Sequence, residues 1–156
     1  MKKTTLLVLL FSLSLLSAQD KIPRHGLSAD IGGSLGGSIK YNYRIIAGNN
    51  FQLTLSTGVV LGILSAGASA GAEVSFGHDH QFIAGISFDP MIIADDDDLV
   101  NGIAIRENLL IPRIGYRWQA KKLGEHFYFH AYVSPIIPLD DDWIMPWFGF
   151  GMLGYF

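Results

Sequence analysis

The chain has 156 residues, of which 49% are hydrophobic and 16% are charged, and it contains no cysteine. This length fits one domain, and the apolar content is too high for a disordered chain. The lack of cysteine excludes disulfide scaffolds, thiolate metal sites and cysteine nucleophiles, and the formal net charge of −3 indicates no basic surface for nucleic acid.

The N-terminus has the features of a secretory signal peptide. Lys2 and Lys3 precede an apolar run over residues 6–16, and the small residues Ser17 and Ala18 follow it. The run is shorter than the roughly 20 apolar residues of a membrane-spanning helix. We therefore expect export and cleavage after residue 18, which leaves residues 19–156 as the mature domain.

The remaining sequence alternates apolar and polar residues with the period of a β-strand. The clearest stretch is residues 51–64, where Leu53 and Leu55 lie on one face and Gln52 lies on the other. The small residues 65–71 are expected to form a loop. The alternation predicts eight strands, over residues 26–35, 38–46, 51–64, 70–77, 81–89, 109–119, 127–135 and 143–156.

Eight strands without a helix fit a closed antiparallel barrel, of which two kinds exist. A soluble lipocalin-like barrel turns its apolar face inward around a ligand. A membrane barrel turns the apolar face outward to lipid and fills its interior with polar groups. Strands of about ten residues are long enough to cross a bilayer when tilted, so their size favours the membrane barrel.

Aromatic residues mark the strand ends that would meet at one side of such a barrel. All of them share the apolar parity of their strands: Tyr43, Phe51, Phe76, Phe82, Trp118, Phe127 and Phe156. Aromatic rings favour the level of the lipid headgroups, so this pattern predicts a girdle at the periplasmic interface. A sparser girdle of Phe88, Trp143 and Trp147 is expected at the opposite interface.

The sequence ends in an aromatic-rich strand whose last residue is Phe156. Bacterial outer-membrane barrels typically end in such a strand, with a terminal Phe that their insertion machinery reads. Over residues 26–156 the chain resembles the small eight-stranded outer-membrane β-barrels, such as the transmembrane domain of outer membrane protein A or outer membrane protein X. Gly154 departs from the family, which usually has a hydrophobic or aromatic residue there.

This resemblance implies an all-β, eight-stranded antiparallel up-and-down transmembrane barrel in the outer membrane of a Gram-negative cell. Its partners would be outer-membrane lipid and lipopolysaccharide, with the barrel-assembly machinery during insertion. We expect a structural or surface-interaction role without a cofactor.

With the apolar face outward, the residues of opposite parity fill the interior. They are Asp30, Lys40, Asn42, Arg44, Gln52, Glu73, Asp89, Arg113, Arg117, Tyr128, His130 and Tyr132. An eight-stranded barrel is filled by its own side chains, and buried charges must pair. We therefore expect a plugged interior without steady conductance, in which Asp30 lies close to Asn42 or Arg44 and Glu73 pairs with Arg113.

The sequence offers little for catalysis. Serine esterase chemistry needs a serine within hydrogen-bond reach of a histidine. His130 and Ser134 share a face but are four residues apart, which is about 13 Å along a strand. The His-x-Ser arrangement of the lipid A deacylases is absent. We predict no catalytic residue; a lipid A- or phospholipid-modifying enzyme and a soluble periplasmic ligand-binding barrel are the alternatives.

Metal binding has weak support in the sequence. The acidic runs at residues 95–98 and 140–142 are expected in exterior loops, either as a divalent-cation site or as solvated surface. His78 and His80 lack a third ligand, so no metal site is predicted.

Overall fold

The computed structural model describes residues 22–32, 36–62, 65–94 and 104–156. The predicted signal peptide over residues 1–18 and the acidic run 95–98 lie outside these residues. None of the described residues belongs to a helix that is long and apolar enough to cross a membrane.

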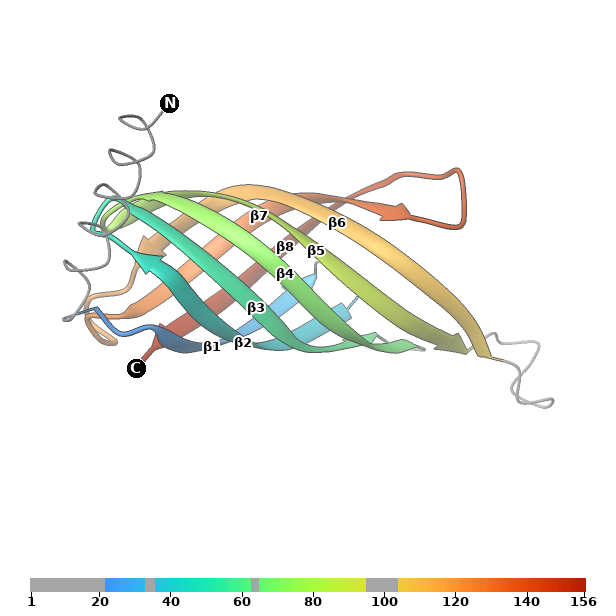
Figure 1. The fold of residues 1–156 in the computed structure, drawn as a ribbon, viewed down its shortest axis with the longest axis horizontal. Coiled ribbons are helices and arrows are strands. Elements are labelled where there is room, and N and C mark those ends of the chain that lie inside the picture. Colours follow the sequence, from blue (N-terminus) through green and yellow to red (C-terminus); the bar gives the residue numbers. More distant parts are fainter. Residues whose placement is uncertain (1–21, 33–35, 63–64, 95–103) are drawn as a thin grey trace, which may run out of the picture.

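The described chain forms one closed antiparallel barrel (Figure 1). Each strand pairs with the next along the chain, and the first strand pairs with the last. The predicted fold class, an eight-stranded up-and-down barrel, is confirmed. The strands are β1 (His25–Gly32), β2 (Gly36–Ala47), β3 (Phe51–Gly62), β4 (Ser65–Gly77), β5 (His80–Ala94), β6 (Ala104–Gln119), β7 (Phe127–Pro138) and β8 (Met145–Tyr155).

The two ends of the barrel differ. At one end, short connections over residues 48–50, 78–79 and 120–126 join the strands, and the C-terminus lies beside them, at the left of Figure 1. We call this the turn end. At the opposite end β5 and β6 run on beyond the shorter β1 and β2. Positive φ at Gly77 (114°) closes the β4–β5 turn, a backbone conformation that glycine adopts without strain.

The largest departures from the predicted elements are three strands that extend further than expected: β5 ends at Ala94 instead of residue 89, β6 begins at Ala104 instead of residue 109, and β4 begins before residue 70. The loop predicted over residues 65–71 is wrong, because β4 begins at Ser65. Ala66 pairs with Leu61 of β3 and with Ile92 of β5. Ladder hydrogen bonds on both sides hold this small-residue segment extended despite its low strand propensity.

A bulge interrupts the alternation near the turn end of β2. Arg44 pairs with Thr54 and Ile46 pairs with Leu53, so Ile45 is the extra residue. The bulge turns Ala47 inward, although the unbroken period would place it outside.

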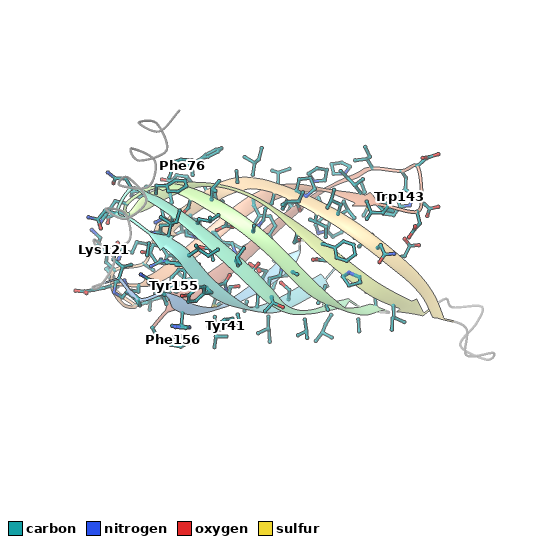
Figure 2. The ribbon with its side chains drawn as sticks, in the orientation of Figure 1. Tyr41, Phe76, Lys121, Trp143, Tyr155 and Phe156 are labelled. Carbon is teal, nitrogen blue, oxygen red and sulfur yellow. The ribbon has the colours of Figure 1, made fainter. Side chains whose placement is uncertain are left out.

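Apolar side chains cover the outside of the barrel. Leu55, Val59 and Leu61 are 45%, 50% and 58% exposed, and Figure 2 shows such side chains projecting away from the wall. Lys40 and Arg113 point the other way and are only 4% and 8% exposed. The barrel therefore has the polarity of a membrane barrel, which is the reverse of a lipocalin-like one.

The inside is not uniformly polar. Towards the end opposite the turns, an apolar cluster fills the interior, formed by Val60, Met91, Leu109, Ile111 and Ile136. Trp147 packs against this cluster, so its predicted place in an outer girdle is wrong. The parity of β8 accounts for this, because Trp147 falls in register with Gly149, Gly151 and Leu153, which are buried.

Candidate functional site in the barrel interior

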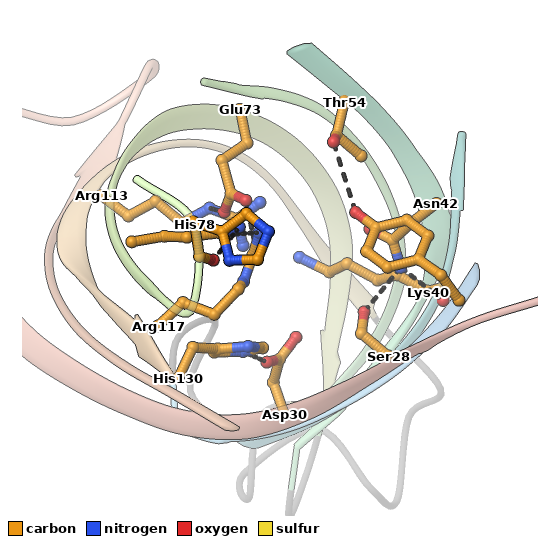
Figure 3. A network of polar contacts seen from close by, with 12 residues as sticks. Ser28, Asp30, Lys40, Asn42, Thr54, Glu73, His78, Arg113, Arg117 and His130 are labelled. Atoms are coloured by element: carbon orange, nitrogen blue, oxygen red, sulfur yellow. Dashed lines mark hydrogen bonds and ion pairs between the residues drawn. The ribbon is translucent and has the colours of Figure 1, made fainter. Parts of the chain in front are cut away.

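The centre of the barrel holds an ionic cluster around Glu73 of β4 (Figure 3). Its carboxylate accepts a hydrogen bond from Arg117, and Arg113 Nε lies 3.4 Å from Glu73 Oε2. The expected approach of Glu73 to Arg113 is thus present in the structure, with Arg117 as a second partner. All three side chains are buried, so the carboxylate screens two guanidinium groups from each other.

Strand register explains how Glu73 reaches Arg113. Glu73 pairs with Gly85 of β5, and Gly85 pairs with Arg113 of β6. A Cβ atom on Gly85 would lie 3.1 Å from Arg113 Nε and 3.2 Å from Glu73 Cβ. Because Gly85 has no side chain, the inner face of β5 is open at this position, and Glu73 and Arg113 can reach each other across it.

A second acid–base pair also meets across a glycine, at the place where β1 and β8 close the barrel. His130 of β7 hydrogen-bonds to Asp30 of β1, and the strand between them contributes Gly151. Ser38 Oγ also donates to Asp30 Oδ2 at 3.2 Å. The expectation that Asp30 would lie close to Asn42 or Arg44 is wrong, because its register partner on β2 is Ser38.

Two further pairs of interior polar groups form local hydrogen bonds. Asn42 Nδ2 donates to Ser28 Oγ at 2.9 Å, and Ser69 Oγ donates to Asp89 Oδ1 at 2.6 Å. Lys40 projects into the same region (Figure 3). All of the predicted interior residues are buried: Asp30, Lys40, Asn42, Arg44, Gln52, Glu73, Asp89, Arg113, Arg117, Tyr128, His130 and Tyr132.

Arg44 is held differently from the other buried arginines. Its guanidinium carbon lies 3.3 Å from the centroid of the Tyr155 ring and 5.9 Å from that of Tyr128. Nη1 donates to the Pro23 carbonyl oxygen at 3.2 Å. Cation–π contact with Tyr155 therefore stabilises a cation near the turn end.

Little free space is left among the central charges. The cavity that Lys40, Glu73, Arg113 and His130 line has a volume of about 10 Å³. That is room for roughly one water molecule. The apolar cluster lies on the side of this layer away from the turn end.

Outside the barrel, aromatic rings gather at the turn end. Figure 2 shows Phe76 and Phe156 there. Phe51 lies 5.1 Å from Phe76, and Trp118 lies 5.8 Å from Phe129, as ring centroids. Of the residues predicted for the girdle, Phe76, Phe82 and Phe156 are exposed, and Tyr43, Phe51, Trp118 and Phe127 are partly exposed.

Sequence reasoning missed two histidine–tyrosine pairs in this outer aromatic region. His25 Nδ1 hydrogen-bonds to the Tyr41 hydroxyl, and His80 Nδ1 hydrogen-bonds to the Tyr116 hydroxyl at 2.7 Å. Each pair joins neighbouring strands, which are β1 and β2 for the first and β5 and β6 for the second. Each histidine is the first residue of its strand.

Among the described residues, no hydrogen bond joins His130 to a serine. The hydrogen-bond partner of His130 is Asp30 rather than a serine. No group of three potential metal ligands occurs among residues 22–32, 36–62, 65–94 and 104–156. In the run 140–142, Asp140 accepts a hydrogen bond from Asn108 at 3.2 Å.

The fold and its interior define the class as a closed eight-stranded up-and-down barrel with a polar centre and an apolar exterior. No family model matches the chain, and no curated protein matches it either. Among solved structures it is similar to the N-terminal β-barrel domain of Pseudomonas aeruginosa OprF, with a TM-score of 0.53 and 15% identity over 85% of this chain and 98% of that one. The fold resemblance to small outer-membrane barrels is therefore confirmed.

Proposed function

We propose that this chain is an integral outer-membrane barrel protein with a structural or surface-interacting role. The observation that carries the proposal is the polarity of the wall, in which Leu55, Val59 and Leu61 face outward while Lys40 and Arg113 face inward. Such an exterior is stable in hydrocarbon, whereas in water the exposed apolar band would be unfavourable. The closed ladder supports it further, since each described strand has a hydrogen-bonded neighbour on both sides.

The aromatic residues at the turn end support an orientation. Rings at one level around the barrel suit a membrane interface. In the family that the chain resembles, short turns face the periplasm, and the long connections face the cell exterior. We therefore place the end opposite the turns, with the β7–β8 connection over residues 139–144, at the cell surface, where a partner would bind.

Two observations test membrane insertion together. The folded protein, boiled and unboiled, should migrate differently in a detergent gel, because a closed barrel resists the detergent until it is heated. In cell fractions it should stay with the outer membrane after carbonate washing. Release into buffer without detergent would overturn the proposal and favour the soluble ligand-binding barrel.

The proposed interior is closed to ions. The central ion pairs, the small cavity between them and the apolar cluster beyond them support this. Reconstituted in a planar bilayer, the protein should show no steady single-channel current, with an open porin as the positive control. A stable, large conductance would contradict a plugged barrel.

We further propose that the protein is not an enzyme. The binding of His130 to Asp30, and its distance in sequence from Ser134, support this. Lipid A from cells with and without the gene should give the same mass spectrum. A mass difference equal to one acyl chain would favour the alternative, a lipid A-modifying enzyme.

A further inference from the structure

A cavity of about 530 Å³ opens at the turn end of the barrel. We call it the vestibule. The connections 48–50, 78–79 and 120–126 contribute to its rim, and Arg44, Gln52 and Tyr128 line it from within the barrel. It is far larger than the 10 Å³ cavity among the central charges, so it offers space that the interior layer does not.

The guanidinium of Arg44 lies at the inner part of this vestibule, and only some of its N–H groups have hydrogen-bond partners. Nη1 binds the Pro23 carbonyl, and the Tyr155 ring covers one face. Nε and Nη2 are buried and have no hydrogen-bond partner. These two nitrogens form one edge of the planar group, and that edge is the one that binds two oxygens of an oxyanion side by side.

The charge balance of the interior points to the same residue. Among the described residues, four buried cations (Lys40, Arg44, Arg113 and Arg117) face three buried carboxylates (Asp30, Glu73 and Asp89). Arg113 and Arg117 share Glu73. Lys40 is repelled by Arg113 and attracted by Asp89, Asp30 and Glu73. In the described part of the chain no ion pair within 4 Å involves Arg44, so a nearby anion would balance its charge.

We propose that the vestibule binds a small oxyanion, a carboxylate or a phosphate, on the Nε–Nη2 edge of Arg44. Such a ligand supplies the missing negative charge and accepts the two unused N–H groups. Because both nitrogens are buried, binding includes a shift of the side chains around Arg44 that opens the edge to the vestibule. Lys121 and His126 also line the rim, but Lys121 is paired with Asp79 and Glu125 adds a second carboxylate, so the proposed contact is with Arg44.

The first test observes the Arg44 side chain directly. The folded wild-type protein in detergent micelles is titrated with inorganic phosphate, and separately with acetate, at constant ionic strength, while the Nε–H signals of the arginines are followed by NMR. The Arg44 signal should shift and saturate, and those of Arg113 and Arg117 should stay in place. A shift with phosphate alone assigns a phosphate site, and a shift with acetate alone assigns a carboxylate site.

The second test uses a matched pair of variants that each remove one positive charge at the turn end. Arg44→Gln should weaken binding of the anion about tenfold or more by calorimetry, because the bidentate contact is lost. Lys122→Gln, an exposed residue outside the vestibule lining, should leave the affinity unchanged. Heat-modifiable gel mobility checks that each variant is folded; if Arg44→Gln does not fold, the wild-type titration decides.

Two outcomes would overturn the site. One is an Arg44 signal that does not move, or that drifts linearly without saturation, with both anions. The other is an equal loss of affinity in Arg44→Gln and Lys122→Gln, which would mean that only the general charge of the turn end attracts anions. Neither outcome bears on membrane insertion, which the fractionation experiment tests separately.

Discussion

Two glycines decide which charged residues meet inside this barrel. Gly85 lies between Glu73 and Arg113, and Gly151 lies between Asp30 and His130. In both cases the acid and the base come from strands that are not neighbours, and the middle strand contributes no side chain. Each pair therefore ties three strands together, and the glycine is as necessary as the charges.

Gly151→Ala tests this role. The new Cβ would lie 2.6 Å from the Ala29 carbonyl oxygen and 2.7 Å from His130 Nε2, and closer still to Asp30. Overpacking of this kind costs about 1–3 kcal/mol, so denaturant unfolding of the detergent-folded protein should show that loss. Gly37→Ala is the control, since its Cβ would meet only the Asp30 carbonyl oxygen at 3.5 Å. Equal stability of the two variants would contradict the role of Gly151.

Glu73→Gln removes the one carboxylate that Arg113 and Arg117 share. Breaking a buried ion pair on one side leaves the other charge unpaired, so the free energy of unfolding should fall by about 3–5 kcal/mol. Urea unfolding followed by tryptophan fluorescence measures this. Asp79→Asn, which breaks the exposed contact with Lys121, should have a much smaller effect. A loss of under about 1 kcal/mol for Glu73→Gln would show a solvated pair instead.

Asp79 in the β4–β5 turn should titrate below its ordinary range. The hydrogen bond from Lys121, followed by that from His78, lowers the pKa of the Asp79 carboxyl. Its small stabilising contribution is therefore present above the ordinary pKa and is lost as the pH falls through the lowered value. In an NMR titration, Lys121→Gln should raise the pKa of Asp79 towards 3.8. An unchanged pKa in that variant would show that Lys121 does not contact it in solution.

At the scale of the strands, alternation in the sequence was enough to predict the number of strands and which residues share a face. Leu53, Leu55 and Val59 fall on one parity, and a pleated strand gives that parity one face. The side that faces outward follows only with the aromatic strand ends and the buried charges. The alternation is strong evidence for a β-barrel in this chain because it recurs in eight successive segments.

Contacts between strands were not predictable to the same degree. Asp30 meets Ser38 and His130 through the registers of β1 with β2 and of β8 with its neighbours, and one sequence contains no direct signal for register. The apolar interior cluster was missed for another reason. Leu109 and Ile111 have the inward parity of β6, but the predicted interior of a membrane barrel contains polar groups only.

A charge on the outer face of β3 tests the environment of the wall. Leu55→Arg places a guanidinium near the middle of the strand, which costs about 2–4 kcal/mol when that depth is hydrocarbon. Asn50→Arg, in the turn before β3, adds the same charge where water is available. Unfolding from phospholipid vesicles should separate the two variants. Equal stability would argue that β3 does not face lipid.

At the scale of the molecule, the interior is layered along the barrel axis. An open vestibule lies at the turn end, an ionic layer around Glu73 occupies the centre, and apolar packing around Ile136 fills the far end. Because different residues form the last two layers, loss of an ion pair in one should leave the side chains of the other in the lumen. We expect single substitutions in the ionic layer to lower stability without opening a steady current in planar bilayers.

The seam between β1 and β8 has a consequence for the order of assembly. Every other ladder joins strands that are consecutive in the chain, whereas this one brings together residues as distant as Gly26 and Tyr155. Loop-closure entropy opposes so long-range a contact until the intervening ladders are in place. A nascent chain that lacks its last strand would expose Asp30 and its partners at an open edge, so completion of synthesis should precede stable burial in lipid.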